Sequence, residues 1–193
     1  MSIPSSLKHA RIRAGLSLTD AAKRSGIQRS NIAAIENGRR DPTASTIEKM
    51  ATASRVRLIP VASDGRTSVA EASDAVADAL HRGEAFRAYR ALIQIADDLA
   101  APDPVDRLVL AIEPPARITP EWDAALAGVT EWRLGAIGLP LPGWVRAEHG
   151  DPAWGWRPPL SDAADSIPVD VGRVPEPLLK RGVLIEADEL ASI

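Results

Sequence analysis

The chain has 193 residues, of which 45% are apolar, and a formal net charge of −3. This length allows one large core or two smaller ones, and the absence of cysteine excludes disulfides, thiolate zinc sites and cysteine catalysis. No apolar run is long enough to cross a bilayer and no signal peptide opens the chain, so we expect a cytoplasmic protein with no membrane partner.

Charge is distributed unevenly along the chain. Residues 1–60 carry 11 Lys and Arg against 4 Asp and Glu, whereas residues 61–193 carry 12 against 22. The first part is therefore +7 and the second −10. A basic segment can approach a polyanion, while an acidic one suits a basic or apolar protein surface. We predict three parts: a basic N-terminal domain over residues 1–62, a linker over 63–68 and an acidic C-terminal domain over 69–193.

The first two helices of the N-terminal domain are predicted from apolar spacing and capping residues. The first spans residues 7–14, with Ile12 on its buried side. Ser17 and Asp20 have the spacing of a capping box, which predicts that a second helix covers residues 18–25.

A tight corner is expected between the second and third helices. Gly26 supplies the left-handed backbone that such a corner needs. The third helix is predicted over residues 28–36. Ser45 and Glu48 then indicate a second capping box, which starts a fourth helix that ends near Ala53.

The segment that follows, residues 55–61, alternates charged and apolar residues and predicts a short strand. A single strand has no ladder partner. We expect it to pair with the same strand of a second copy, through Val56, Leu58 and Ile59, so that the chain is a homodimer. The alternative is pairing with the C-terminal residues 182–187.

The outward face of the third helix is small and polar. Ile32 and Ile35 are expected to face the core, which leaves Arg29, Ser30 and Ala34 directed outward or to the flanks. A solvated face would more usually carry Glu or Lys, whereas small residues let a helix enter a groove. Arg29 can bond guanine in bidentate fashion, Ser30 can bond either base type, and Ala34 can contact the methyl group of thymine.

Further polar residues flank this helix. Its N-terminus brings positive dipole and free N–H groups toward a phosphate. Gln28, Asn37, Arg39 and Arg40 are suitably placed to hold the DNA backbone. The alternative interpretation is a helical hairpin with an incidental basic edge.

The stretch LSLTDAAKRSGIQRSNIAAIENGRRDPTASTIEKMA resembles the helix-turn-helix of the Xre (Cro/C1-type) repressor family. The resemblance covers residues 7 to about 58. It implies that DNA is faced by Gln28, Arg29, Ser30, Asn31 and Ala34, and that the DNA backbone is contacted by Asn37, Arg39 and Arg40. Leu18 stands where the family often has a glutamine that touches DNA, so we expect that contact to be missing.

The C-terminal domain is predicted to be helical as well, which makes the fold mainly α. Glycine and proline separate four expected helices, over residues 69–81, 84–100, 105–112 and about 119–137. Residues 138–160 are dense in proline, glycine and tryptophan and predict an irregular segment without helix or strand. Its Trp144, Trp154 and Trp156 either pin the segment onto the helices or form an exposed patch for a partner.

No catalytic or metal-binding constellation is present in the sequence. His9, His81 and His149 are scattered, and there is no zinc-protease motif, nucleophile elbow or glycine-rich phosphate loop. The acidic residues near 97–98 and 103–106 are best explained as a solvated face. We therefore expect no enzyme activity, no metal and no cofactor.

Scattered segments of residues 80–190 resemble the C-terminal region of Xre-type antitoxins that are paired with nucleotidyltransferase-fold toxins. They include LHRGEAFRAYRALIQIADDL, GLPLPGW and PEPLLKRGVLIEADEL. The resemblance implies an antitoxin that binds double-stranded operator DNA, represses its own operon and neutralises a cognate toxin. Residue type alone suggests the toxin contacts Arg87, Arg90, Trp144, Trp154 and Arg181. The alternatives are a stand-alone regulator whose C-terminal domain senses a small ligand, or an enzyme with a helix-turn-helix appendage.

Overall fold

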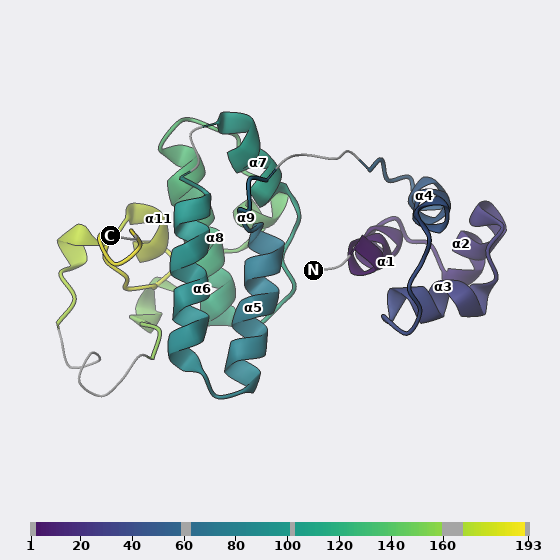
Figure 1. Cartoon of the computed structure of the whole chain (residues 1–193). Coiled ribbons are helices and arrows are strands. Elements are labelled where there is room, and N and C mark those ends of the chain that lie inside the picture. Colours follow the sequence, from purple (N-terminus) through teal and green to yellow (C-terminus); the bar gives the residue numbers. More distant parts are fainter. Residues whose placement is uncertain (1–2, 59–62, 101–102, 160–167, 192–193) are drawn as a thin grey trace. The chain divides into compact units, whose positions relative to one another are not determined.

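The computed structural model describes residues 3–58, 63–100, 103–159 and 168–191 (Figure 1). The chain divides into two compact units, which we call the head (residues 1–61) and the body (residues 62–193). The described residues are mainly helical, as the sequence predicts, and contain no strand beyond one isolated bridge between Trp156 and Val183. None of the described helices combines the length and the apolar character that a membrane span requires.

Four helices build the head: α1 (Ile3–Arg13), α2 (Leu18–Ser25), α3 (Arg29–Glu36) and α4 (Ala44–Ala53). The predicted bounds of α2 are confirmed, and so is the corner that follows, since Gly26 has a φ of 69°. Apolar side chains from all four helices form one core, made of Leu7, Ala21, Ile32, Ile35, Met50 and Ala51. This core fixes how α2 and α3 lie against each other.

The expected buried side of α1 and the expected cap of α4 are both wrong. Ile12 is exposed, because the buried side of α1 carries Leu7 and Arg11 instead. The cap of α4 is Thr43 and not Ser45: the Thr43 hydroxyl accepts a hydrogen bond from the Thr46 amide at 3.3 Å, which starts the helix at Ala44.

The predicted strand is wrong over its described part. Arg55 has a φ of 58°, a left-handed conformation that a strand cannot contain. The Val56 amide then bonds back to the Ala51 carbonyl at 2.8 Å, and the Val56 side chain packs against the head core. Leu58 has no regular structure, and Ile59 lies outside the described residues. The alternative pairing with residues 182–187 is also wrong for Val183, whose bridge partner is Trp156.

The body is built around one helix, α8 (Pro120–Gly135), whose residues from Trp122 to Thr130 are all buried. Around it pack α5 (Val69–His81), α6 (Ala85–Asp98), α7 (Pro104–Ile112), α9 (Gly143–Ala147) and α11 (Glu176–Leu179). Two short 3₁₀ turns, η1 (Pro152–Trp154) and η2 (Val171–Arg173), lie between α9 and α11. The predicted helices thus agree with α5 to α8, apart from one or two residues at some ends.

A glycine allows α11 to approach α8 closely. A Cβ atom at Gly128 would lie 2.7 Å from Leu178 Cδ2 and 3.2 Å from Leu178 Cα. Leu178 is fully buried, so it has little room to move away. The missing side chain at Gly128 therefore lets the C-terminal part of the chain pack onto the central helix.

The segment rich in proline and tryptophan is more regular than predicted, because α9 and η1 both lie within it. Trp144 donates its indole N–H to the Ala111 carbonyl at 2.9 Å, and Trp156 meets Trp122 edge-on with ring centroids 5.3 Å apart. Both tryptophans pack against the body core, so they pin the segment onto the helices. Trp154 differs, since 37% of its surface is exposed.

Asp98 does not belong to a solvated acidic face. It is buried, and its two carboxylate oxygens accept hydrogen bonds from the Thr67 amide at 2.9 Å and the Gln94 side chain at 3.0 Å. The carboxylate thereby joins the chain before α5 to the end of α6. The expectation of a solvated carboxylate is therefore wrong at this position.

Candidate nucleic-acid interface

Both ends of α2 are fixed by local hydrogen bonds. The Ser17 hydroxyl accepts from the Asp20 amide at 3.1 Å, and the Asp20 carboxylate accepts from the Ser17 amide at 3.0 Å, which confirms the predicted capping box. The hydrogen bond from the Ser17 hydroxyl, followed by that from its amide, lowers the pKa of Asp20. At the other end, the Gly26 amide bonds to the Ala22 carbonyl at 3.0 Å, so that α3 starts three residues later.

α3 presents the predicted polar residues on its accessible side. Ile32 and Ile35 are buried in the head core, as expected. Gln28, Arg29 and Ser30 at the start of the helix are exposed. Asn31 and Ala34 are half-buried, and Asn37, Arg39 and Arg40 beyond the helix end are exposed. The residues predicted to face DNA thus lie on and around one exposed helix.

The N-terminus of α3 carries no side-chain cap. Gln28 occupies the capping position, but its side chain makes no capping hydrogen bond. Helix N-termini leave amide groups without intrahelical partners, and these groups bind phosphate well. The start of α3 can therefore hold an anion without first releasing a cap.

Two long-range hydrogen bonds organise the polar residues around α3. Arg40 Nη1 donates to Asn31 Oδ1 at 2.8 Å, and Lys8 Nζ donates to Asn37 Oδ1 at 3.2 Å. The first bond holds Arg40 against α3, the helix that carries the residues predicted to read bases. The second brings Lys8 of α1 to the edge of the interface. Sequence reasoning missed Lys8, because no local pattern relates it to a residue 29 positions later.

A buried ion pair holds α1 and α3 together beneath this surface. Arg11 Nε and Nη2 donate to the two carboxylate oxygens of Glu36, each at 2.8 Å, and Arg11 Nη1 donates to the Leu16 carbonyl at 2.7 Å. The hydrogen bonds to Glu36 are the main cause of the raised pKa of Arg11. Sequence reasoning missed this pair as well, although Glu36 directly follows the buried Ile35.

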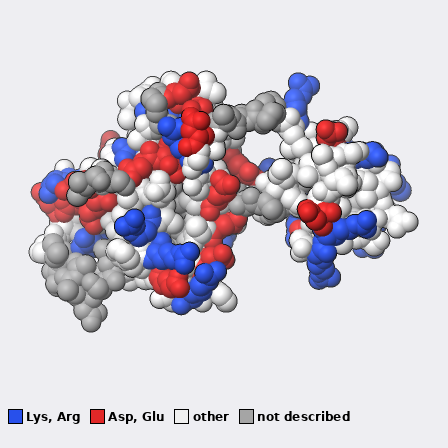
Figure 2. Space-filling view, in the orientation of Figure 1, with Lys and Arg blue, Asp and Glu red and all other residues white. Residues whose placement is uncertain are grey.

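The two units differ in surface charge, as the sequence predicts. Figure 2 shows Lys and Arg with few acidic side chains over the head, and abundant Asp and Glu over the body. Leu18, which replaces the expected DNA-contacting glutamine, packs against the head core. The charge distribution therefore favours the head as the DNA-binding unit.

The residues suggested as partner contacts lie in different environments in the body. Arg87 and Arg90 are exposed on α6, and Arg87 lies 3.3 Å from the Glu84 carboxylate. Trp154 is partly exposed, whereas Trp144 is half-buried with its N–H engaged. These residues do not form one cluster of free side chains.

The suggested toxin contact at Arg181 is wrong. Its side chain is buried and donates to the carbonyls of Glu148, Pro177 and Val145 at 3.0, 2.8 and 3.2 Å. It also pairs with the Glu131 carboxylate at 2.7 Å. Arg181 therefore stabilises the packing of the C-terminal segment and is not available to a partner.

No group of three or more His, Asp or Glu side chains within the described ranges could hold a metal ion. The His149–Asp151 region includes a structural contact, since Asp151 Oδ1 accepts from the Ala153 amide at 2.9 Å and caps η1. The carboxylate of Asp103 likewise caps α7 through the Val105 amide at 2.7 Å. These carboxylates have local structural roles.

Comparison with known proteins agrees with the geometry of the head. Residues 7–58 match the helix-turn-helix family model of the Xre and Cro/C1 type. No curated protein and no solved structure shows significant similarity to the chain. The matched residues contain all four helices of the head from Leu7 onward, together with the exposed face of α3. The chain therefore carries a helix-turn-helix DNA-binding module of the kind found in transcription regulators.

Proposed function

We propose that the head reads a specific operator with α3 in the major groove of DNA. The observation that carries this proposal is the exposed, uncapped start of α3 next to the exposed Arg29 and Ser30. Arg29, Ser30 and Ala34 would contact base edges, with Gln28 and Asn31 beside them. Asn37, Arg39 and Arg40 would hold the DNA backbone and set the register of the helix.

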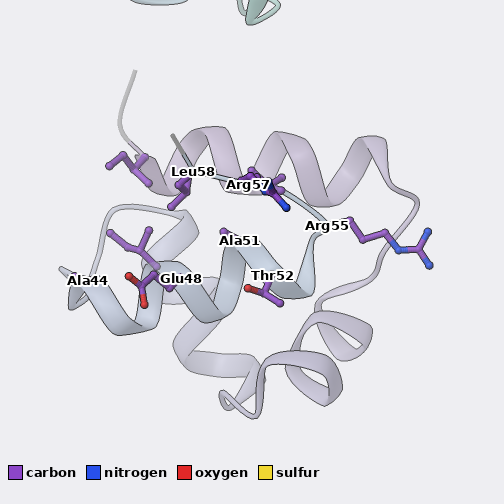
Figure 3. Close-up of a pocket in the computed structure, with 10 residues that line it drawn as sticks. Ala44, Glu48, Ala51, Thr52, Arg55, Arg57 and Leu58 are labelled. Carbon is purple, nitrogen blue, oxygen red and sulfur yellow. The ribbon is translucent and has the colours of Figure 1, made fainter. Parts of the chain in front are cut away.

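We further propose that two heads bind as a two-fold dimer, through a groove of about 730 Å³ between α1, α4 and residues 55–58. Figure 3 shows Leu58, Glu48 and Arg57 around this groove, which Ile3 also lines. Ile3 and Leu58 are exposed. A second copy would cover them, with Val56 and Leu58 near the contact.

Charge supports a second copy as the occupant of this groove. Glu48, Arg55 and Arg57 form no ion pair with any described residue. In a two-fold contact the acidic side chain of one copy can meet a basic side chain of the other. The same surface then supplies both the negative and the positive charge of each pair. This dimer replaces the strand pairing that the sequence suggested.

For the body we propose that it neutralises a cognate toxin of the nucleotidyltransferase type, which makes the chain an autorepressing antitoxin. The support is the resemblance of its sequence and the net charge of −10 over residues 61–193, which suits a basic protein. A small-ligand sensor is less well supported. The cleft beside Trp144 measures about 180 Å³, whereas ligand pockets usually hold about 300–1,000 Å³. The hollow beside Lys180 measures about 340 Å³ but is lined mostly by charged and polar residues, whereas ligand pockets are mostly apolar.

Two experiments test these proposals. The first measures binding of the full chain to the DNA upstream of its own gene, at several salt concentrations and against a scrambled duplex. We expect a salt-dependent affinity that is at least about 10³-fold tighter for the upstream DNA. Equal binding to both duplexes would contradict operator recognition.

The second experiment expresses the product of the neighbouring gene with and without this chain. We expect growth arrest by the neighbour alone and rescue by co-expression. A harmless neighbour, or a toxic one that the chain fails to rescue, would contradict the antitoxin function while leaving operator binding intact.

A further inference from the structure

One helix of the body, α7, has an apolar face that points away from the body core. Leu110 and Ala111 are buried against the other helices. On the opposite side, Val105 and Ile112 are 64% and 60% exposed. They lie seven residues apart, which places them about 10 Å from each other along the same face of a helix.

Two half-buried residues complete this face. Leu108 and Val109 lie between Val105 and Ile112 at helical spacing, so the four side chains form one apolar stripe. Arg107 lies on the inner side, where it donates to the carbonyls of Arg133 at 3.3 Å and Ala100 at 3.1 Å. A helix that is apolar on both sides is normally buried on both sides. The outer stripe of α7 therefore lacks a covering surface within the described body.

Acidic side chains border the stripe. Asp106 and Glu113 lie along one edge of α7 by helical spacing, and Asp103 precedes its first turn. Asp106 and Glu113 form no ion pair with any described residue. A covering surface would therefore need an apolar centre and a basic rim.

A second copy that packs its α7 antiparallel to this one fits the surface poorly. In an antiparallel two-fold pair of α7 helices, the acidic edges would lie side by side and their carboxylates would repel. We propose that the stripe formed by Val105, Leu108, Val109 and Ile112 is the docking surface for the basic partner protein of the body. This inference rests on the proposed antitoxin function and gives it a location, on α7 and not on the arginines of α6.

The test uses the full chain co-expressed with the product of the neighbouring gene, and measures the affinity between the two purified proteins. Val105→Asp and Ile112→Asp should each weaken the complex at least tenfold. Both positions are exposed, so the thermal transition of the free chain should not change. Asp106→Lys combined with Glu113→Lys should also weaken the complex and reduce its dependence on salt.

Two control variants locate the effect. Val171→Asp changes an exposed apolar residue of η2 and should leave the affinity unchanged. Phe86→Asp changes an exposed residue of α6 next to Arg87. Loss of binding in Phe86→Asp, with normal binding in the α7 variants, would overturn the inference but keep the proposed function. If Val105→Asp instead dissociated a homodimer of the chain, the inference would likewise be overturned and the proposed function kept. A wild-type chain that does not bind its neighbour would overturn both.

Discussion

Arg11 and Glu36 form a buried bidentate ion pair that joins the first and third helices of the head. The two hydrogen bonds are each 2.8 Å long, and the side chains are 10% and 4% exposed. Glu36 is the last residue of α3, so the pair fixes the end of the proposed recognition helix against α1. The position of α3 on the head thus depends on a contact across 25 residues of sequence.

The first prediction concerns this ion pair. Glu36→Gln should destabilise the head by about 3 kcal/mol, because removing one charge of a buried pair leaves the other uncompensated. Urea unfolding of the full chain, followed by circular dichroism, would measure the loss. Asp41→Asn removes an exposed carboxylate charge from the same unit; it is the control and should change little. Equal stability of both variants would contradict a structural role for the pair.

Arg29→Ala tests base reading by α3. The variant should lose about 1–3 kcal/mol on the operator and discriminate less at one base position. Binding to a set of single-base operator variants would measure this. Arg82→Ala removes the same charge from the body and serves as the control. A loss of equal size on every duplex would mean that Arg29 contacts only phosphate.

Arg40→Ala should behave differently, because Arg40 is proposed to hold the DNA backbone. The variant should weaken binding to all duplexes alike and lower the slope of log affinity against log salt by about one unit. Its hydrogen bond to Asn31 predicts coupling as well, so that Asn31→Ala has a smaller effect when Arg40 is already absent. An unchanged salt slope would rule out the phosphate contact.

Gly128→Ala tests the close approach of α8 and α11. A methyl group there would meet Leu178 at 2.7 Å, so the variant should lose about 1–3 kcal/mol by overpacking, less the gain in helix propensity. Gly135→Ala is the matched control on the same helix, since its Cβ would meet no atom within 4 Å. We expect thermal unfolding at a lower temperature for Gly128→Ala only. Equal or higher stability would show that Leu178 can move aside.

The raised pKa of Tyr89 should make the stability of the body fall as the pH rises in the alkaline range. Its hydroxyl donates to Glu189 Oε2 at 2.9 Å. Burial, followed by the negative charge of Glu189, raises the pKa of Tyr89 far above its usual value. In the unfolded chain the phenol loses its proton near pH 10. Above that pH the folded chain still keeps the phenol proton that the unfolded chain has lost. The contribution of Tyr89 to the free energy of unfolding is therefore complete below about pH 10 and declines as the pH rises above it.

The measurement is urea unfolding of the wild type and Tyr89→Phe between pH 8 and 11. The wild type should lose stability more steeply than the variant above about pH 10. Parallel curves would mean that the Tyr89 phenol does not contribute to the pH dependence.

Much of the fold could be predicted from local sequence. The pairing of Ser17 with Asp20 and the glycine at Gly26 are signals that act within a few residues. They bound α2, which forms where predicted. The apolar spacing of Ile32 and Ile35 identified the buried side of α3 for the same reason. The strand predicted at 55–61 was wrong in its described part, because alternation alone does not reveal the left-handed turn at Arg55.

The sequence by itself determined the longer helices of both units, the helix that carries the exposed Arg29 and Ser30, and the distribution of charge. Only the tertiary structure decided that Arg11 meets Glu36, that Arg40 meets Asn31, and that Arg181 is buried. It also decided that Val105 and Ile112 remain uncovered on α7. The reason is physical. Helix caps and turns depend on neighbours within a few residues, whereas burial and long-range pairing depend on how the helices pack in three dimensions.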